Sequence, residues 1–156
     1  MATRNLLFIV AAFALIASAC SSGGDAPSGT AAEIADNVFA EAGVEPFGPT
    51  ISLETPADIE FFLGSTNYPE FTDSAVVQPL VNIDTRILYI LMVETADDAD
   101  DVKAQLEEDV DPTKLICVAF SLEDVVIDYR DNVVFMVIDS NHDERDALAE
   151  AFQAID

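Results

Sequence analysis

The feature that most constrains the fold is an uninterrupted apolar run, ILYILMV, from Ile87 to Val93. Successive side chains of a strand point to opposite faces of a sheet, so this run would present apolar side chains to both faces. Such strands lie in the buried middle of a sheet. Hydrophobicity alone would also suit a buried helix, but the length and the β-branched residues of the run favour a strand. The run therefore predicts a central buried strand.

Further strands are predicted on both sides of this run. Residues 75–81 form a strand that Pro79 restricts to an edge, because proline cannot donate a hydrogen bond to a neighbouring strand. Residues 115–120 form another strand. Residues 125–129 and 133–138 flank a short turn and predict a β-hairpin.

Helices are predicted between these strands. Residues 31–42 carry an apolar stripe that ends at Gly43. Thr55 and the proline after it begin a second helix, which Gly64 ends. Thr95 begins a third, acidic helix, and the last helix begins near Asp143. We expect an α+β fold with an antiparallel or mixed sheet of four or five strands. Three to four helices would pack mainly on one side as a two-layer sandwich.

The N-terminal segment has the pattern of an export signal. Arg4 is followed by the uncharged apolar stretch from Leu6 to Ala19. That stretch is shorter than the ~20 residues of a membrane-spanning helix but suits the hydrophobic region of a signal peptide. Residues 1–19 are therefore predicted to be a lipoprotein-type signal peptide.

Cys20 is the predicted lipidation site. The sequence Ala17-Ser18-Ala19-Cys20 resembles a bacterial lipobox, although an aliphatic residue is more usual at the position of Ala17. Residues 20–30 would be the lipidated cysteine with a flexible Ser/Gly/Pro tether, and residues 31–156 a single acidic domain. The resemblance implies a diacylglycerol anchor and a location on the extracytoplasmic face of the cell membrane. The alternative is an ordinary cleavable signal peptide with a cysteine nearby.

The charge of the chain excludes one class of partner. It has 30 Asp and Glu residues against 6 Lys and Arg, a net charge of −24. Arg4 is the only charged residue ahead of Cys20, so removal of the signal leaves −25. Nucleic acid binding requires Lys and Arg to neutralise phosphates, so no nucleic acid partner is expected. Solubility, adaptation to high salt and capture of cations or basic peptides all remain as explanations of the acidity.

These patterns together resemble a known group of proteins. The segments that carry the resemblance are the lipobox and tether, Ile34-Ala35-Asp36, the helical segment ending near Gly64, Asn82-Ile83-Asp84, residues 87–93, residues 98–103, residues 133–138 and Phe152. The chain is similar to the uncharacterised domain-of-unknown-function 4358 family of small lipoproteins of Gram-positive bacteria. The resemblance covers most of residues 31–156 and rests on hydrophobic patterns. It implies a membrane-anchored extracytoplasmic protein and assigns no activity.

One segment has the spacing of a calcium-binding loop. Asp139, Asn141 and Asp143 alternate, and Glu150 occupies the twelfth position, as in loops whose oxygens surround a hard cation. Glu144 stands where such loops have glycine, however. The same residues also fit a helix N-cap with acidic residues in the first turn. Ca²⁺ is the only candidate cofactor.

Catalytic signatures are weak. His142 is the only histidine, and no nucleophile-elbow motif surrounds any serine. Cys117 lies in an apolar run without a basic neighbour to lower its pKa, which favours an inert buried thiol.

Three hypotheses therefore remain. The first is a non-enzymatic lipoprotein whose domain binds a cell-envelope protein. The second is a cation- or solute-binding protein that uses the Asp139–Glu150 loop or the acidic helix of residues 97–111. The third is a hydrolase that uses His142.

Overall fold

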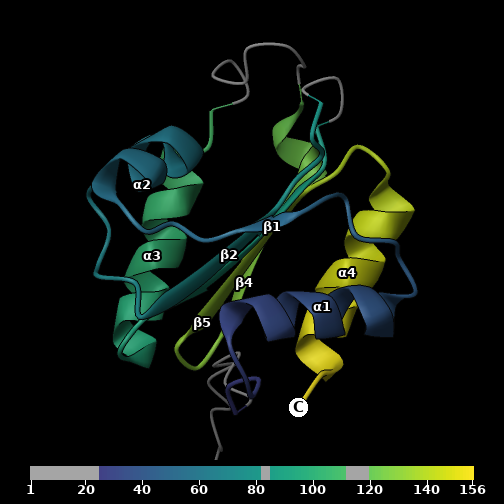
Figure 1. The fold of residues 1–156 in the computed structure, drawn as a ribbon, viewed down its shortest axis with the longest axis horizontal. Helices are drawn as coiled ribbons and strands as arrows, with labels where there is room; N and C mark the ends of the chain where they lie inside the picture. The colour runs from purple at the N-terminus through teal and green to yellow at the C-terminus, as the bar shows by residue number, and fades with distance from the viewer. Residues whose placement is uncertain (1–24, 82–84, 112–119) are drawn as a thin grey trace, which may run out of the picture.

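The computed structural model describes residues 25–81, 85–111 and 120–156. Five strands form one open antiparallel sheet in the order β1-β2-β3-β5-β4 (Figure 1). The strands are β1 (Thr50–Ile51), β2 (Asp73–Val77), β3 (Ile87–Met92), β4 (Val125–Arg130) and β5 (Val133–Ile138). The α+β class and the five-stranded sheet expected from the sequence are confirmed.

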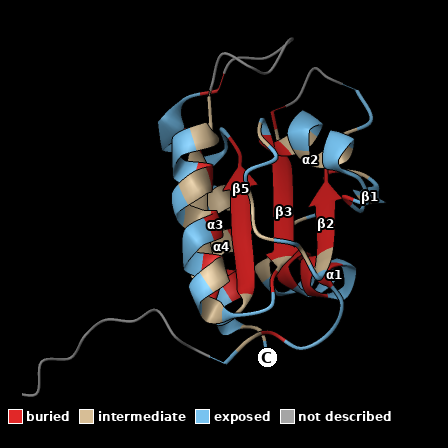
Figure 2. Cartoon of the chain, turned by 90° about the vertical axis from the view of Figure 1, so that its left-hand side faces the viewer, coloured by how far each residue is buried: buried red, intermediate tan, exposed pale blue. Residues whose placement is uncertain are grey.

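The apolar run forms the centre of the sheet, as predicted. β3 pairs with β2 on one side and with β5 on the other, and Ile87 lies opposite Ile138 in the second pairing. β4 and β5 form the predicted hairpin, in which Arg130 pairs with Val133. Figure 2 shows β2, β3 and β5 buried along almost their whole length.

Four α-helices and one short 3₁₀-helix accompany the sheet. They are α1 (Ala31–Ala42), α2 (Pro56–Leu63), α3 (Ala96–Asp109), η1 (Leu122–Asp124) and α4 (His142–Ala154). A threonine caps each of the first three α-helices: the hydroxyls of Thr30, Thr55 and Thr95 accept a backbone N–H from three residues further on. Gly43 and Gly64 end α1 and α2 in the left-handed conformation that favours glycine.

The helices cover both faces of the sheet. α1 and α4 pack on the face formed by Val77, Leu88 and Phe135, whereas α2 and α3 pack on the face formed by Tyr89 and Met136 (Figure 1). The prediction of helices mainly on one side is therefore corrected: the fold has three layers. The physical reason is that β3 and β5 are apolar at every position, so each face of the sheet must be covered.

Two strand predictions also differ from the structure. β2 is not an edge strand, because β1 pairs with its outer side, and β2 ends at Val77, before Pro79. β1 itself has two residues and carries no apolar alternation that would have indicated it. Of the predicted strand at 115–120, residues 115–119 lie outside the described residues, and Phe120 belongs to no strand.

The predicted flexible tether of residues 20–30 is corrected for residues 25–30, which are attached to the fold because Arg130 binds the carbonyl of Asp25 and Thr30 caps α1. Pro27 is buried, and the backbone N–H of Ser28 donates to the C-terminal residue Asp156 at 3.1 Å. The described residues include no helix long and apolar enough to cross a bilayer. The predicted signal peptide, Cys20 and Cys117 lie outside the described residues.

Candidate functional site

A pocket of about 100 Å³ opens at one end of the sheet, on the face covered by α2 and α3. Its floor is formed by β3 and β5. Its walls are formed by α2, the end of α3 and Phe120, which lies just before η1. The lining residues are mostly apolar: Phe61, Phe62, Leu63, Gly64, Ile87, Tyr89, Leu106, Asp109, Val110, Asp111, Phe120, Met136 and Ile138.

Capping and packing place α2 at the pocket. Thr55 and Asp58 form a reciprocal capping box at its start, with hydrogen bonds of 2.9 and 3.2 Å to each other's backbone N–H. At its other end, Gly64 donates its N–H to Glu60 and turns the chain away. Leu63 is the only fully buried residue of α2, and Ile59 and Phe62 are partly buried against the same core.

Two tyrosines supply the polar groups of this region. The Tyr89 hydroxyl inside the pocket donates to the carbonyl of Phe62 at 3.3 Å. The Tyr68 hydroxyl donates to the Asp109 carboxylate at 2.9 Å. Burial raises the pKa of both hydroxyls, and the hydrogen bond to Asp109 and its negative charge raise the pKa of Tyr68 further. Both groups therefore remain neutral donors and do not act as bases near pH 7.

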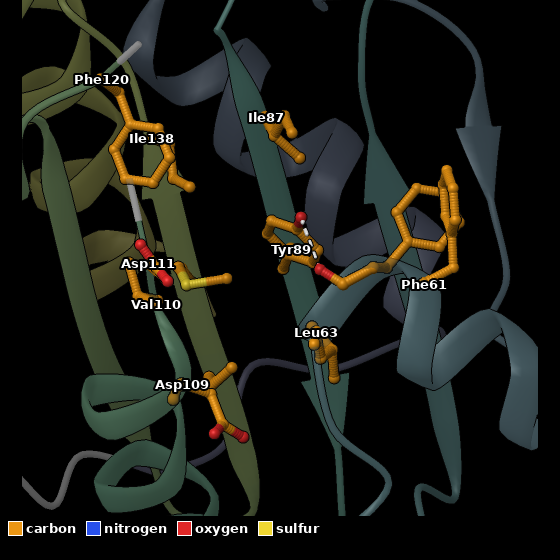
Figure 3. Close-up of a pocket in the computed structure, with 13 residues that line it drawn as sticks. Phe61, Leu63, Ile87, Tyr89, Asp109, Val110, Asp111, Phe120 and Ile138 are labelled. Carbon is orange, nitrogen blue, oxygen red and sulfur yellow. Dashed lines mark hydrogen bonds between the residues drawn. The ribbon is translucent and has the colours of Figure 1, made fainter. Parts of the chain in front are cut away.

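The pocket joins an apolar rim to an acidic rim. Figure 3 shows Phe61 and Leu63 of α2 on one side and Asp109, Val110 and Asp111 on the other, with Ile87 and Tyr89 between them. The Phe61 side chain is 78% exposed and stands edge-on against Phe62, with ring centroids 5.0 Å apart. An apolar side chain with a positively charged neighbour would match both rims.

Basic residues within the described part of the chain are engaged in internal contacts. Arg86 lies 5.0 Å from the Phe47 ring centroid and 3.7 Å from Glu144, and Lys103 lies 3.7 Å from Glu107. Arg145 donates to Asp146, and Arg130 donates to backbone carbonyls. The acidic side chains therefore dominate the electrostatic field that an approaching partner meets.

The structure does not gather the predicted calcium ligands around one point. Asp139 is buried at the end of β5, where its Oδ1 accepts the Asn141 N–H at 2.8 Å. Asn141 is the N-cap of α4, and Asp143 and Glu150 are exposed on that helix. Seven residues of helix separate these two carboxylates by about 10 Å. Among residues 25–81, 85–111 and 120–156, no group of three or more His, Cys, Asp or Glu side chains could hold a metal ion.

His142 forms an ion-pair cluster between η1 and α4. Its Nε2 lies 2.9 Å from Asp124 Oδ1, while the Ser121 backbone N–H donates to Asp124 Oδ2 at 2.7 Å. Arg145 donates to the carbonyl of Glu123. The hydrogen bonds from Ser121 and His142, with the charges of His142 and Arg145, hold the pKa of Asp124 below its usual value.

This cluster lacks the order of a catalytic triad. A hydrolase would need the imidazole between a carboxylate and a nucleophile. The structure gives His142 the carboxylate, and no hydrogen bond joins it to a serine among the residues that are described. The contacts of this cluster hold η1 against the first turn of α4.

Comparisons with known proteins find no matching family model, no matching curated protein and no matching solved structure. The resemblance to a family of Gram-positive lipoproteins thus stays a prediction.

Sequence reasoning singled out one wall of the pocket without predicting the pocket. Residues 107–111 place four acidic side chains at the C-terminal end of α3, where they oppose the helix dipole. The sequence predicts residues 97–111 only as a candidate cation-binding helix, and in the structure Asp109 and Asp111 form the acidic rim of the pocket. Nothing in the sequence marks Phe61 as exposed, because a phenylalanine in a short amphipathic helix usually belongs to the hydrophobic core.

Proposed function

We propose that this chain is a membrane-anchored extracytoplasmic lipoprotein whose domain is a non-enzymatic binding module. The anchor would be a lipid on Cys20, as the lipobox-like sequence predicts. The binding surface would be the pocket, and the partner a cell-envelope protein that presents an apolar side chain beside basic residues.

The observation that carries the proposal is the exposed Phe61 beside an apolar pocket with an acidic rim. Leu80 and Val81 are also exposed, by 84% and 60%. The segment that holds them lies at the same end of the sheet as α2 (Figure 1). Exposed apolar side chains grouped beside a pocket are typical of protein-binding surfaces.

The size of the pocket favours a side chain as its occupant. Sites for small organic ligands commonly enclose ~300–1,000 Å³, whereas this pocket encloses about 100 Å³. That volume suits one apolar side chain of a partner. The described lining residues supply two carboxylates and the Tyr89 hydroxyl but no histidine, lysine or serine, which suits binding better than group transfer.

The proposal is tested with two labelled peptides and the lipoprotein reconstituted in vesicles of zwitterionic lipid. One peptide carries a phenylalanine between lysines, and the other carries it between glutamates. We expect fluorescence anisotropy to show binding of the lysine peptide only. Phe61→Ser should weaken it about five- to thirty-fold, because ~1–2 kcal/mol of apolar contact is lost.

Leu122→Ser is the matched control. Leu122 is exposed to a similar degree as Phe61 but does not line the pocket. The control should change the affinity less than twofold. Equal binding of the two peptides, or an equal loss in the two variants, would contradict the proposed binding surface.

A further inference from the structure

The end of the domain opposite the pocket holds the chain that leads to Cys20. Arg130, at the end of β4, is buried, and its guanidinium joins two distant segments. One nitrogen, Nη1, donates to the carbonyls of Phe152 and Ile155 at 3.0 and 2.6 Å. The other, Nη2, donates to the carbonyl of Asp25 at 2.7 Å. Arg130 thus satisfies carbonyls at the C-terminal end of α4 and binds the N-terminal segment at the same time.

The neighbouring residues strengthen this attachment. Ala26 packs against the core between α1, α4 and the sheet, and Pro27 is buried. Ser28 donates its backbone N–H and its hydroxyl to the carbonyl of Asp156, at 3.1 and 3.2 Å. We call Arg130, the segment Asp25–Ser28 and the end of α4 the tether clamp.

The tether clamp shortens the free part of the predicted tether. Residues 25–28 belong to the fold, so only residues 21–24 separate Cys20 from the first clamped residue. Fully extended, the five steps from Cys20 to Asp25 span at most about 18 Å. A free tether of residues 21–30 would reach roughly twice as far and would let the domain turn in any direction.

We propose that the tether clamp orients the domain on the membrane, with the β4–β5 turn and the end of α4 facing the bilayer and the pocket facing away. This inference rests on the lipid anchor of the proposed function. The clamped segment makes one end of the sheet the membrane-proximal surface, which faces the lipid headgroup layer without binding it.

The two ends are well separated. The β4–β5 turn, the C-terminus and the N-terminal segment lie at one end of the molecule, and α2, η1 and the end of α3 lie at the other (Figure 1). Ile87, at the start of β3, lines the pocket, whereas Met92, at the other end of that strand, pairs with Val133 beside the turn. A strand of this length spans about 17 Å.

Electrostatics prevent the domain from lying flat. Asp25, Asp131 and Asp156 are exposed at the membrane-proximal end, and the basic side chains that the structure describes are engaged internally. No described face offers the cluster of Lys and Arg that anionic headgroups attract. Repulsion within a Debye length of about 8–10 Å therefore holds the domain off the lipid at the end of its short tether.

The test measures energy transfer from a fluorophore on the acylated, full-length protein to a labelled lipid headgroup in vesicles. In a Cys117→Ala background, the fluorophore is attached through Asp131→Cys at the β4–β5 turn or through Leu80→Cys near the pocket. Both positions are exposed. We expect transfer from position 131 to be at least threefold more efficient than from position 80.

A longer tether provides the matched variant without disturbing the fold. Ten Gly/Ser residues inserted after Gly24 leave the tether clamp intact and should lower transfer from position 131 until the two positions differ less than twofold. Equal transfer from both positions in the anchored protein with the natural tether would overturn the inference alone. A protein that shows no transfer and does not float with the vesicles would instead overturn the lipid anchor.

Discussion

The two ends of the sheet differ in how they are held together. At the end that carries the β4–β5 turn, Arg130 bonds three carbonyls, and Asn132 donates its side-chain amide to the carbonyl of Val93 at 2.8 Å. At the pocket end, α2 buries a single side chain, and Phe61 is exposed. Binding surfaces commonly lie in the less consolidated parts of a fold. Under the proposed function, the first end would supply stability and position, and the pocket end would supply recognition.

The largest expected effect comes from the tether clamp. Arg130→Met removes one buried and two part-buried hydrogen bonds and leaves the buried carbonyl of Phe152 without this donor, which should lower the free energy of unfolding by about 3–5 kcal/mol. Urea denaturation measures the loss.

Lys103→Met is the control for this variant. It makes the same change of a cation to methionine in an exposed i,i+4 pair with Glu107. It should change stability by less than about 0.5 kcal/mol. A loss of similar size in both variants would show that the clamp does not consolidate its end of the sheet.

Removing the N-caps of α1 and α2 should have a smaller effect on stability, and it compares the two ends of the sheet directly. Thr30→Ala and Thr55→Ala each remove an N-cap, a change that commonly costs ~1 kcal/mol. α1 buries five residues and α2 buries one, so the two helices should respond differently. Thr30→Ala should lower global stability by about 1 kcal/mol.

Thr55→Ala should instead act locally. Amide hydrogen exchange should speed up within α2, while the urea midpoint changes little, because opening α2 exposes little of the core. An equal change of global stability in both variants would contradict the difference between the ends.

The ion pair at η1 predicts a pH dependence. The folded-state pKa of Asp124 is lowered from its usual 3.8, so its contribution to stability is present above that value. The contribution disappears as the pH falls through the lower, folded-state pKa. Asp124→Asn should therefore lower stability at pH 7 and flatten the decline of the unfolding midpoint below pH 4.

His142→Gln tests how much of this pH dependence comes from the contact between His142 and Asp124. It removes one partner of Asp124 and leaves the hydrogen bond from Ser121, so the decline in acid should be reduced only in part. An unchanged acid profile in Asp124→Asn would show that this pair does not stabilise the fold.

Calcium should have the smallest effect. The predicted ligands are spread from the end of β5 to the third turn of α4. We therefore expect about 1 mM Ca²⁺ to shift the melting temperature by less than about 1 °C, as measured by calorimetry against EDTA. A ligand at a hundred times its Kd would add ~2.7 kcal/mol, so a rise of several degrees would restore the calcium-loop hypothesis.

Much of the fold could be predicted because local patterns specify it. The apolar run of β3, the two strand-forming runs on either side of the β4–β5 turn and the threonine caps depend on neighbours in sequence. The three-layer arrangement was also implicit in β3 and β5, since strands that are apolar at every position require cover on both faces. The apolar pattern of these strands was used only to place them in the middle of the sheet. It also requires a layer of helices on each face.

The candidate site could be predicted less well because it depends on contacts distant in sequence. Phe61, Tyr89 and Asp109 meet only after α2 and α3 pack on the sheet, and none belongs to a recognisable motif. The bonds from Arg130 to Asp25 and Ile155 join residues 105 and 25 positions apart. The composition of residues 21–30 predicts a flexible linker, but residues 25–28 are attached to the fold, because carbonyl groups bound by a distant arginine leave no trace in composition.

The lipid on Cys20 is the central claim, because the location, the orientation and the access of a partner to the pocket all depend on it. The most direct measurement is metabolic labelling with a palmitate analogue of the natural protein and of Cys20→Ser. We predict strong labelling and membrane flotation of the natural protein and loss of both in the variant. Equal labelling of the two proteins, or a protein purified from cells that still begins at Met1, would contradict the account.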